Sequence, residues 1–411
     1  MNGENRNTTA LVVAQETGLV AVPQKPLGYW ARCAKKYRTA LMLLSFALAV
    51  FLVIFAVLSS HAFTYDSFFY FARDVKTMMT LADLSDHALY YDYGGASAMP
   101  VSYRGGIAVA HEAGVDVYDA VGEQLLSVRE ELTMRMPRIA VSRDYLVVFD
   151  FGSNRFIVCN SYDKLFEGTT EAPIYAAFVS DAGYVSLITG SDTYLSEVYL
   201  YDAQFNLRLH SYRTSATVST VVADNGRTMT IVGATAEGTL VDVYMIGGDL
   251  GDEKPLSSTV LAGFPLAAGY TAGTKLAILT DTAAYTLATD GKVYRTVDYE
   301  GGALYAYHID ENGIALALET DRLHGTYRVL VLNKKGRVEC DIARGTRVRA
   351  LTLSDDRLWL LGEQEATCID RDTEMTVGVL EVNGSALSIV ALNDKLARII
   401  YTAEARSFAI Q

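Results

Sequence analysis

A repeat of about 41 residues runs through most of the chain and limits it to few architectures. Each unit begins with a short polar or glycine turn followed by an apolar strand, as in Arg104-Gly105-Gly106 before IAVAHEAG. Eight such turns occur, separated by 39, 38, 43, 48, 39, 44 and 38 residues. This period is typical of the four-stranded blades of a β-propeller. The turns are marked by Gly105, Asp144, Ala182, Asn225, Gly273, Asn312, Asp356 and Asp394.

The sixth unit shows most clearly how many strands a unit holds. It reads ALYAYHI, IALALE, TYRVLVLN and RVECDI, with turn residues between the segments. Four short strands rich in β-branched and aromatic residues, joined by three hairpins, fit one propeller blade. The sequence therefore predicts an all-β fold, an eight-bladed β-propeller, with seven blades as the alternative.

The last unit lacks one strand. It supplies ALSIVALN, KLARIIYT and RSFAIQ and then reaches Gln411. Upstream of the first unit lies a strand-like run at residues 88–93, ALYYDY, closed by Gly94-Gly95. We expect this N-terminal run to complete the last blade, because a closed ring leaves no open sheet edge.

A second feature is a run of 27 residues without a charged side chain, between Arg38 and Asp66. Its apolar core from Ala40 to Leu58 would rise about 28 Å as a helix, close to the ~30 Å hydrocarbon thickness of a bilayer. Basic residues crowd the N-terminal side of this run, whereas the first charge after it is acidic. By the positive-inside rule, the sequence predicts one transmembrane helix at residues 39–60 with a cytoplasmic N-terminus.

The alternative for this run is a cleaved signal peptide, because Ser60-His61-Ala62 has small residues at the offsets that a signal peptidase requires. Its apolar segment is longer than the usual ~7–15 residues, which favours an uncleaved anchor. We therefore expect a disordered cytoplasmic tail at 1–38, the helix at 39–60, a juxtamembrane stalk at 61–86 and an extracytoplasmic propeller at 87–411. The protein would lie in the cell membrane with a single pass.

Charge separates the two sides of this span. Residues 1–38 carry six basic and two acidic side chains, whereas the remainder carries 29 basic and 46 acidic ones. An exported domain with a net charge of −17 is repelled by nucleic acid and by anionic lipid headgroups. The expected partners are the bilayer, through the single span, and a protein or envelope polymer at one propeller face.

Cysteine and histidine patterns indicate neither a disulfide framework nor a metal site. Cys33 precedes the span and is expected to be an unmodified thiol, with acylation as the alternative. Cys159, Cys340 and Cys368 fall in strand-like segments without CxxC spacing, and Cys340 with Cys368 is the pair to test. The histidines never fall at metal-ligand spacing, so surface or packing roles are expected for His61, His87, His111, His210, His308 and His324.

Acidic residues are the remaining candidates for chemistry. Asp249, Asp252 and Glu253 cluster in the insertion GGDLGDEKP, which lacks the alternation of a calcium loop and is expected to be solvated. Carboxylate pairs for glycoside hydrolysis stay open, although aspartates at strand ends are commonly turn formers. These aspartates are Asp116, Asp119, Asp150 and Asp202. We therefore assign no catalytic, cofactor-binding or metal-binding residue and no cofactor.

Three segments resemble known propeller repeats: GVDVYDAVGEQLLS at 114–127, SEVYLYDAQFNLRLHS at 196–211 and YRVLVLNKKGRVECD at 327–341. They are similar to the repeats of quinoprotein-like and outer-membrane assembly propellers. The layout of one anchor followed by an acidic propeller resembles the uncharacterised Gram-positive membrane-anchored family catalogued as domain of unknown function 5711. That resemblance implies a location and a fold, and it brings no assigned function.

Two functions stay open from the sequence. The first is a membrane-tethered binding or scaffold module of the cell envelope, which the closed ring and the lack of a catalytic motif favour. The second is an enzyme acting on cell-envelope glycan, or another hydrolase, with carboxylates at the channel mouth. A broad face rich in Tyr and Phe would support binding, whereas two carboxylates converging on one pocket would support catalysis.

Overall fold

The computed structural model describes residues 10–13, 19–22, 36–38, 41–46, 50, 88–91, 98–129, 133–223, 225–246, 254–271 and 275–410. The chain divides into two compact units, Met1–Lys76 and Thr77–Gln411. In the first unit, β1 (Ala10–Val13) pairs antiparallel with β2 (Leu19–Val22), and residues 36–38 and 41–46 are helical.

The predicted transmembrane helix at 39–60 is described only at residues 41–46 and 50, all of which are helical. In the described part of the chain, no helix has the length and apolarity required to cross a membrane. The rest of that predicted helix and the predicted stalk at 61–86 lie outside the described residues.

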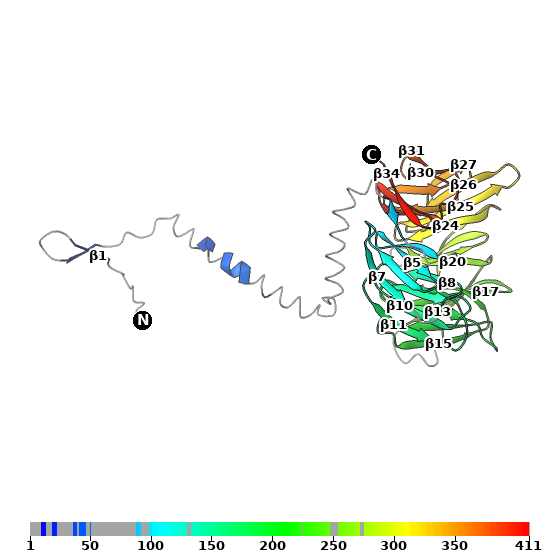
Figure 1. Ribbon diagram of the computed structural model, residues 1–411, viewed down its shortest axis with the longest axis horizontal. Coiled ribbons are helices and arrows are strands. Elements are labelled where there is room, and N and C mark those ends of the chain that lie inside the picture. The colour runs from blue at the N-terminus through cyan, green and yellow to red at the C-terminus, as the bar shows by residue number, and fades with distance from the viewer. Residues whose placement is uncertain are drawn as a thin grey trace. The chain divides into compact units, whose positions relative to one another are not determined.

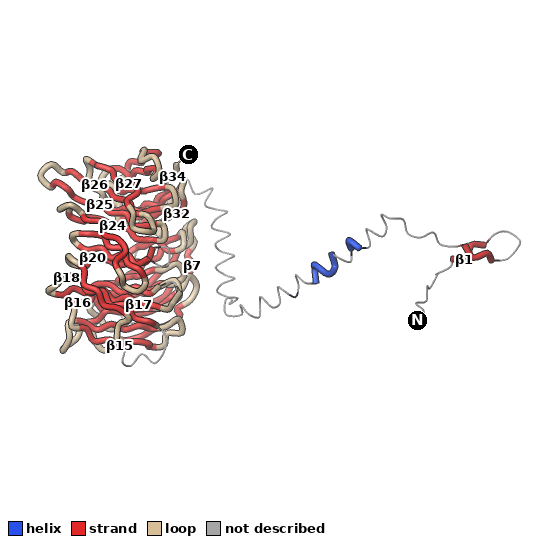
Figure 2. The backbone as a smooth tube through the Cα atoms, turned by 180° about the vertical axis from the view of Figure 1, so that it is seen from behind, coloured by secondary structure: helices blue, strands red, loops and turns tan. Residues whose placement is uncertain are grey.

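The second unit is an eight-bladed β-propeller, as predicted, and the seven-bladed alternative is wrong. Eight antiparallel sheets of four strands each make up the blades (Figures 1 and 2). We name the strands of a blade A to D from the inside outward, because the A strands of neighbouring blades contact one another.

The first four blades follow one another along the chain, each with its strands in the order A to D. Blade 1 holds β4 (Met99–Tyr103), β5 (Gly106–His111), β6 (Gly114–Tyr118) and β7 (Gln124–Arg129). Blade 2 holds β8 (Pro137–Val141), β9 (Leu146–Asp150), β10 (Arg155–Cys159) and β11 (Lys164–Thr169). Blade 3 holds β12 (Ile174–Val179), β13 (Val185–Thr189), β14 (Ser196–Tyr201) and β15 (Leu207–Arg213). Blade 4 holds β16 (Ala216–Val222), β17 (Thr228–Thr235), β18 (Gly238–Met245) and β19 (Ser257–Leu261).

The remaining blades continue in the same order until the last, whose strand D comes from the other end of the unit. Blade 5 holds β20 (Pro265–Thr271), β21 (Lys275–Thr280), β22 (Ala283–Ala288) and β23 (Val293–Asp298). Blade 6 holds β24 (Ala303–Asp310), β25 (Gly313–Asp321), β26 (Thr326–Leu332) and β27 (Val338–Arg344). Blade 7 holds β28 (Ala350–Leu353), β29 (Arg357–Leu361), β30 (Glu365–Asp370) and β31 (Thr376–Glu381). Blade 8 holds β32 (Ser388–Asn393), β33 (Leu396–Ile400), β34 (Glu404–Ala409) and β3 (Leu89–Tyr90).

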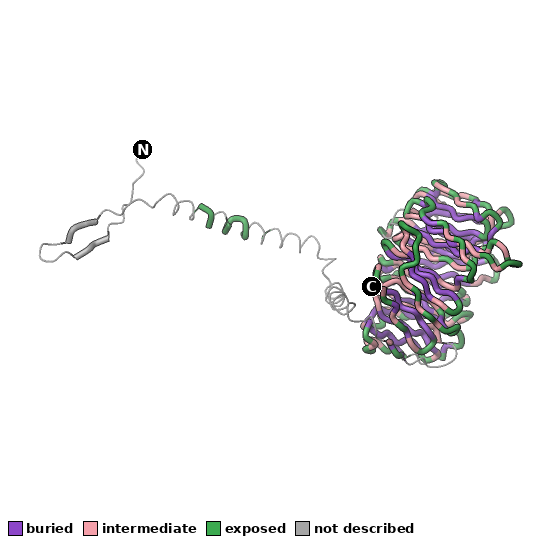
Figure 3. Tube along the Cα trace, turned by 90° about the horizontal axis from the view of Figure 1, so that it is seen from above, coloured by how far each residue is buried: buried purple, intermediate pink, exposed green. Residues whose placement is uncertain are grey.

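Burial within a blade explains its sequence pattern. Strands B and C are apolar runs because both of their faces are covered, and every residue of β5, β6, β13 and β14 is buried. Figure 3 shows buried segments running through the propeller between exposed turns. Strand D alternates instead, as in β23, because one face meets solvent. The hydrophobic clusters each join two neighbouring blades, as Val117 of blade 1 and Leu146 of blade 2 do, so stacking of blades forms the core.

The ring closes as predicted. Strand β3 pairs antiparallel with β34, with Leu89 opposite Ala405 and Tyr90 opposite Glu404. Leu89 is buried in a cluster that joins blade 8 to blade 1. The Tyr91 hydroxyl donates to the backbone oxygen of Glu404 at 3.0 Å. One strand from the beginning of the unit therefore completes a blade built by its end.

The alternation of strands gives the propeller two distinct ends. Because successive strands are antiparallel, the A–B and C–D turns of every blade lie at one end, which we call the A–B end. The B–C turns and the loops from strand D to the next strand A lie at the other, which we call the B–C end. Loops at such ends are the usual positions of binding residues on a rigid scaffold.

Candidate functional site

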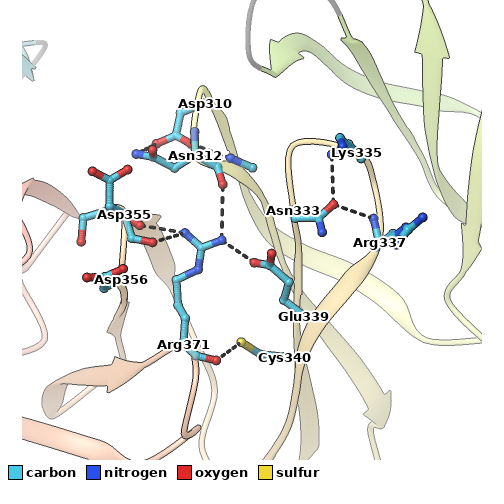
Figure 4. Close-up of polar contacts among 12 residues, drawn as sticks. Asp310, Asn312, Asn333, Lys335, Arg337, Glu339, Cys340, Asp355, Asp356 and Arg371 are labelled. Atoms are coloured by element: carbon cyan, nitrogen blue, oxygen red, sulfur yellow. Dashed lines mark hydrogen bonds and ion pairs between the residues drawn. The ribbon is translucent and has the colours of Figure 1, made fainter.

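A polar cleft lies between blades 6 and 7 at the A–B end (Figure 4). Its volume is about 580 Å³, within the range of ~300–1,000 Å³ common for ligand pockets. Blade 6 contributes its A–B turn, its C–D hairpin and the start of strand D, and blade 7 contributes its A–B and C–D turns. The cleft is lined by Asn312, Asn333, Lys334, Lys335, Arg337, Glu339, Asp355, Asp356, Arg371 and Asp372.

Arg371 forms the floor of this cleft and joins three turns. Its Nη1 donates to the backbone oxygens of Ser354 and Asp355 at 2.8 and 2.9 Å. Its Nη2 donates to Glu339 Oε2 at 2.6 Å and to the backbone oxygen of Asn312 at 3.4 Å. The Arg371 side chain is only 9% exposed, so these partners occupy its guanidinium and hold blades 6 and 7 together.

The C–D hairpin of blade 6 forms the basic side of the cleft and is held in one conformation. Asn333 Oδ1 accepts the backbone N–H groups of Lys335 and Arg337 at 3.0 and 3.1 Å. Gly336 adopts a φ of 70°, and a Cβ there would lie 2.2 Å from Thr286 Oγ1 of blade 5. The turn therefore needs glycine, and its backbone is held in one conformation beside the cleft.

The A–B turn of blade 7 forms the acidic side and is held equally firmly. The backbone N–H of Asp356 donates to Asp394 Oδ1 of blade 8 at 3.0 Å. The backbone oxygen of Asp356 accepts the N–H of Arg371 at 3.0 Å. Figure 4 shows Arg371 and Glu339 between this turn and the basic hairpin.

Cys340 lies beneath the cleft and is not a nucleophile. Its Sγ donates to the backbone oxygen of Arg371 at 3.0 Å. Burial raises the pKa of this thiol to about 11, so the unreactive protonated form persists at neutral pH. No residue that lines the described cleft is Ser, Thr, His or Cys. Its side chains are suited to binding charged groups by ion pairs and hydrogen bonds.

The four carboxylates considered for glycoside hydrolysis are occupied by contacts in three different blades. Asp119 Oδ1 accepts two backbone N–H groups of the C–D turn of blade 1, and Asp202 Oδ1 does the same in blade 3. Asp150 Oδ1 accepts two backbone N–H groups of the loop that enters blade 2. Asp116 is buried and contacts the buried His111 and the half-exposed Arg129. These contacts give the four aspartates structural roles, and none of the contacts favours glycoside hydrolysis.

The described histidines each contact a carboxylate. Two of the six, His61 and His87, lie outside the described residues. Among the described residues, no group of three or more His, Cys, Asp or Glu side chains is arranged to hold a metal ion. The pairs are His111 with Asp116, His210 with Glu197, His308 with Asp310 and His324 with Asp321.

The network of Asp116 predicts acid-sensitive stability. The pKa of Asp116 falls to about 2, because hydrogen bonds from His111 and Arg129 outweigh the opposing effect of burial. Since this folded pKa is below the ordinary value of ~3.9, the ionised carboxylate stabilises the fold above about pH 4, and that stability is lost as pH falls towards 2. We expect Asp116→Asn to lower the free energy of unfolding by about 2 kcal/mol at pH 7 and by much less near pH 2.

Urea unfolding of the unit Thr77–Gln411 at several pH values measures this effect. Asp192→Asn is the control, because Asp192 is exposed. A constant difference between Asp116→Asn and the parent across the pH range would contradict the prediction.

The other residues named from the sequence fall into two groups. Cys340 and Cys368, the one pair left open for testing, are both buried and do not form a disulfide with each other. Cys33 and the acidic insertion with Asp249, Asp252 and Glu253 lie outside the described residues.

The B–C end carries a second candidate surface, which arises from β-bulges. In blades 3, 4, 5 and 6 the ladder between strands A and B shifts register at the same position near this end. The extra residue of each strand A is apolar. A bulge turns its extra residue out of the regular alternation, and bulges are typical of functional positions. These four residues, which we call the bulge arc, are Tyr175, Val218, Leu266 and Tyr305.

Further apolar and aromatic side chains surround the bulge arc. Phe151 packs on Tyr175 with ring centroids 5.7 Å apart, and Phe264 is exposed beside Leu266 in the chain. The Arg347 guanidinium stacks over the ring of Tyr305 at 3.9 Å. Blades 6 and 7 add a shallow pocket of about 970 Å³ that Arg347 also lines. This end of the propeller therefore presents aromatic and aliphatic groups over blades 2 to 6, beside a mostly polar pocket between blades 6 and 7.

Sequence reasoning found neither the cleft nor the bulge arc. Tyr175, Val218, Leu266 and Tyr305 are 43, 48 and 39 residues apart, close to the spacing of the repeat. Aligning the eight units on their turns would have shown a recurrent apolar residue at this place. For the cleft, the only sequence signal is the dense run of charges in NKKGR, which reads equally well as a solvated turn.

Comparison with known proteins supports the fold and one resemblance. Residues 91–241 match the family described as "Family of unknown function (DUF5711)". The resemblance inferred from the sequence is therefore confirmed over that segment. No curated protein matches the chain.

Solved structures of low sequence identity share the propeller. Sqt1 of Saccharomyces cerevisiae has a TM-score of 0.56 and 9% identity, covering 80% of this chain and 100% of Sqt1. The C-terminal WD40 domain of Sif2 has a TM-score of 0.54 and 11% identity, covering 80% of this chain and 97% of that domain. BamB from Moraxella catarrhalis has a TM-score of 0.50 and 11% identity, covering 79% of this chain and 98% of BamB. At these identities the likeness shows the fold alone.

Proposed function

We propose that this protein is a membrane-tethered, extracytoplasmic binding module of the cell envelope, and that its B–C end binds a protein partner. The observation that carries this proposal is the bulge arc of Tyr175, Val218, Leu266 and Tyr305. Four neighbouring blades present an apolar residue at the same height of the inner strand. Together with Phe151 and Phe264, they make this end the broad aromatic face expected of a binding protein.

The chemistry of this surface suits a protein partner. Tyrosine, phenylalanine and arginine are enriched at the centres of protein interfaces, because they bury a large area at a small cost in conformational entropy. Arg347 stacked on Tyr305 combines an aromatic face with a cation, an arrangement that favours Arg and Tyr as binding hot spots. Ladder pairs on both sides of each bulge hold its backbone, so little backbone entropy is lost when a partner binds.

The tether and its orientation rest on the sequence. The uncharged run at 39–65 is long enough for one span, and the basic residues before it favour a cytoplasmic N-terminus. The acidic propeller would then lie outside the membrane, where its charge keeps it away from anionic headgroups. A propeller held in this way would gather a partner at the membrane surface.

Site-specific photo-crosslinking in the cell tests the proposal. Benzoylphenylalanine in place of Tyr175, which is 49% exposed at the B–C end, should give a discrete adduct with a protein. Tyr294 is the matched control, because it is a tyrosine with 51% exposure at the A–B end and should give no adduct of that mass. The adduct from position 175 should also be lost when Tyr305→Glu places a charge in the bulge arc.

Two results would count against the proposal. The first is the same set of adducts from positions 175 and 294, which would indicate chance encounters. The second is an adduct at position 175 that forms at full yield in Tyr305→Glu, which would show that binding does not depend on the bulge arc. The thermal unfolding of each variant should match the parent, since both tyrosines are about half exposed.

A further inference from the structure

The cleft between blades 6 and 7 has two oppositely charged sides that do not neutralise each other. Six charged side chains that line it form no ion pair or hydrogen bond with the described residues. Three are basic and three are acidic, so their formal charges sum to zero. They are Lys334, Lys335 and Arg337 from blade 6, and Asp355, Asp356 and Asp372 from blade 7.

We propose that this cleft binds an extended peptide segment in which basic and acidic residues alternate. This site is separate from the bulge arc, which lies at the other end of the propeller. A bound segment would direct its acidic side chains towards the hairpin with Lys335 and Arg337. It would direct its basic side chains towards the turn with Asp355 and Asp356.

The arrangement of charges in the cleft disfavours ligands that carry charge of only one sign. A simple anion attracted by the hairpin of Lys335 and Arg337 also meets Asp355 and Asp356 across the cleft. A simple cation attracted by Asp355 and Asp356 is likewise repelled by Lys335 and Arg337. Because like charges brought together cost free energy, only a ligand that carries both signs gains on both sides. Within the domain's net charge of −17, this locally balanced cleft is therefore selective for a mixed-charge ligand.

Strand geometry explains why the charges of the ligand should alternate. In an extended peptide, successive side chains point to opposite sides of the backbone. A segment lying along the cleft with its backbone over Arg371 therefore directs residues i and i+2 to one side and residue i+1 to the other. Alternating basic and acidic residues place every charge opposite its complement. A peptide of the same composition with its charges in two blocks places half of them wrongly.

The cleft is also built to keep its shape in the absence of a ligand. Arg371 is occupied by four acceptors, so it acts as a floor and not as the recognition group. Asn333 and Gly336 hold the basic hairpin, and Asp394 holds the acidic turn. A volume of about 580 Å³ accommodates a segment of a few residues. Preorganised charges of this kind give specificity more than affinity.

Fluorescence polarisation with two isomeric peptides tests the proposal. Fluorescein-labelled Gly-Lys-Asp-Lys-Asp-Gly and Gly-Lys-Lys-Asp-Asp-Gly have the same composition and net charge, and they differ only in charge order. At low salt, where screening is weak, the alternating peptide should bind the full-length protein at least about fivefold more tightly than the blocked one. The preference should decline as salt is added.

Charge reversal of the hairpin supplies the matched variants. Lys335→Glu combined with Arg337→Glu makes both sides of the cleft acidic, so the preference for the alternating peptide should disappear. Both side chains are exposed and without partners among the described residues, so the fold should be retained. Lys292→Glu is the control, because Lys292 lies in the corresponding C–D hairpin of blade 5 and is also exposed.

Each outcome decides whether the cleft binds a peptide of alternating charge, whatever binds at the B–C end. Preferential binding of the alternating peptide that the double variant abolishes and Lys292→Glu leaves intact supports the proposal. Equal binding of the two isomers, no measurable binding of either, or a preference that survives the double variant overturns it. Neither peptide has an aromatic or aliphatic side chain and both carry the same dye, so failure here leaves the proposed function of the bulge arc untouched.

Discussion

A chain that begins at residue 98, and so lacks β3, should be less stable than the unit Thr77–Gln411 by about 3–8 kcal/mol. The loss has two parts. Leu89 is 2% exposed, and removing a buried leucine side chain costs ~2–5 kcal/mol. The Tyr91 hydroxyl also donates to the backbone oxygen of Tyr401, and leaving that buried oxygen without a donor costs ~1–3 kcal/mol. Urea unfolding followed by circular dichroism measures the difference.

The shortened chain should also associate. Without β3, the outer edge of β34 presents unpaired N–H and C=O groups to solvent, and such an edge pairs readily with another strand. We expect size-exclusion chromatography to show dimers or larger species for the chain from residue 98, and none for the chain from residue 77.

A point substitution separates these effects from those of shortening. In the unit Thr77–Gln411, Leu89→Ala should cost part of the stability, whereas Tyr90→Ala should cost little because Tyr90 is exposed on the same strand. Equal stability of the chains from residues 77 and 98 would contradict the role of β3. It would mean that blade 8 is equally stable with three strands.

The closing strand could be predicted because it follows from counting. Eight turn-and-strand units need 32 strands, and the last unit contains only three of its four. Of the expected strand at 88–93, the structure describes residues 88–91, and the ladder uses Leu89 and Tyr90. Tyr91 still donates its backbone N–H to Ala403, while its ring crosses to Tyr401 and Glu404. Tyr91 therefore still contacts blade 8, although it lies just outside the ladder.

The candidate sites could not be predicted in the same way, because each depends on register or on contact between blades. The bulge at Tyr175 is set by which residue of β13 pairs with Ile174 and which with Ala176. No local pattern in the sequence specifies this shift. Likewise, the charges of NKKGR are plain in the sequence, but their opposition to Asp355 and Asp356 depends on the stacking of blades 6 and 7.

Replacement of Arg398 by methionine should destabilise the propeller by about 2–5 kcal/mol. Arg398 lies in β33 of blade 8 and is 1% exposed. Its Nη1 donates to the backbone oxygen of Gly105, and its Nη2 donates to that of Ala120 at 3.1 Å. Both acceptors belong to turns of blade 1, so this side chain joins the two blades between which the ring closes.

The opposing effect is the cost of burying a cation. Burial lowers the pKa of Arg398 to about 10, which shows that its surroundings disfavour the charge. Methionine removes that cost, and buried ions replaced by apolar residues are sometimes neutral. However, methionine also leaves two turn carbonyls without their donor, at ~1–3 kcal/mol each. Because hydrogen bonds to charged donors are the stronger class, we expect the loss of these bonds to dominate.

Two companion variants make the measurement decisive. Arg398→Lys keeps the charge but lacks the planar guanidinium that reaches both Gly105 and Ala120, so its stability should be intermediate. Arg406→Met removes an exposed arginine of the same blade that pairs with Glu404, and it should change the free energy of unfolding by less than about 1 kcal/mol. The contrary result is that Arg398→Met proves as stable as the parent while Arg398→Lys is destabilised. The free-energy cost of burying the Arg398 cation would in that case equal the stabilisation from its two hydrogen bonds. Closure would then depend on β3 and the apolar cluster around Leu89.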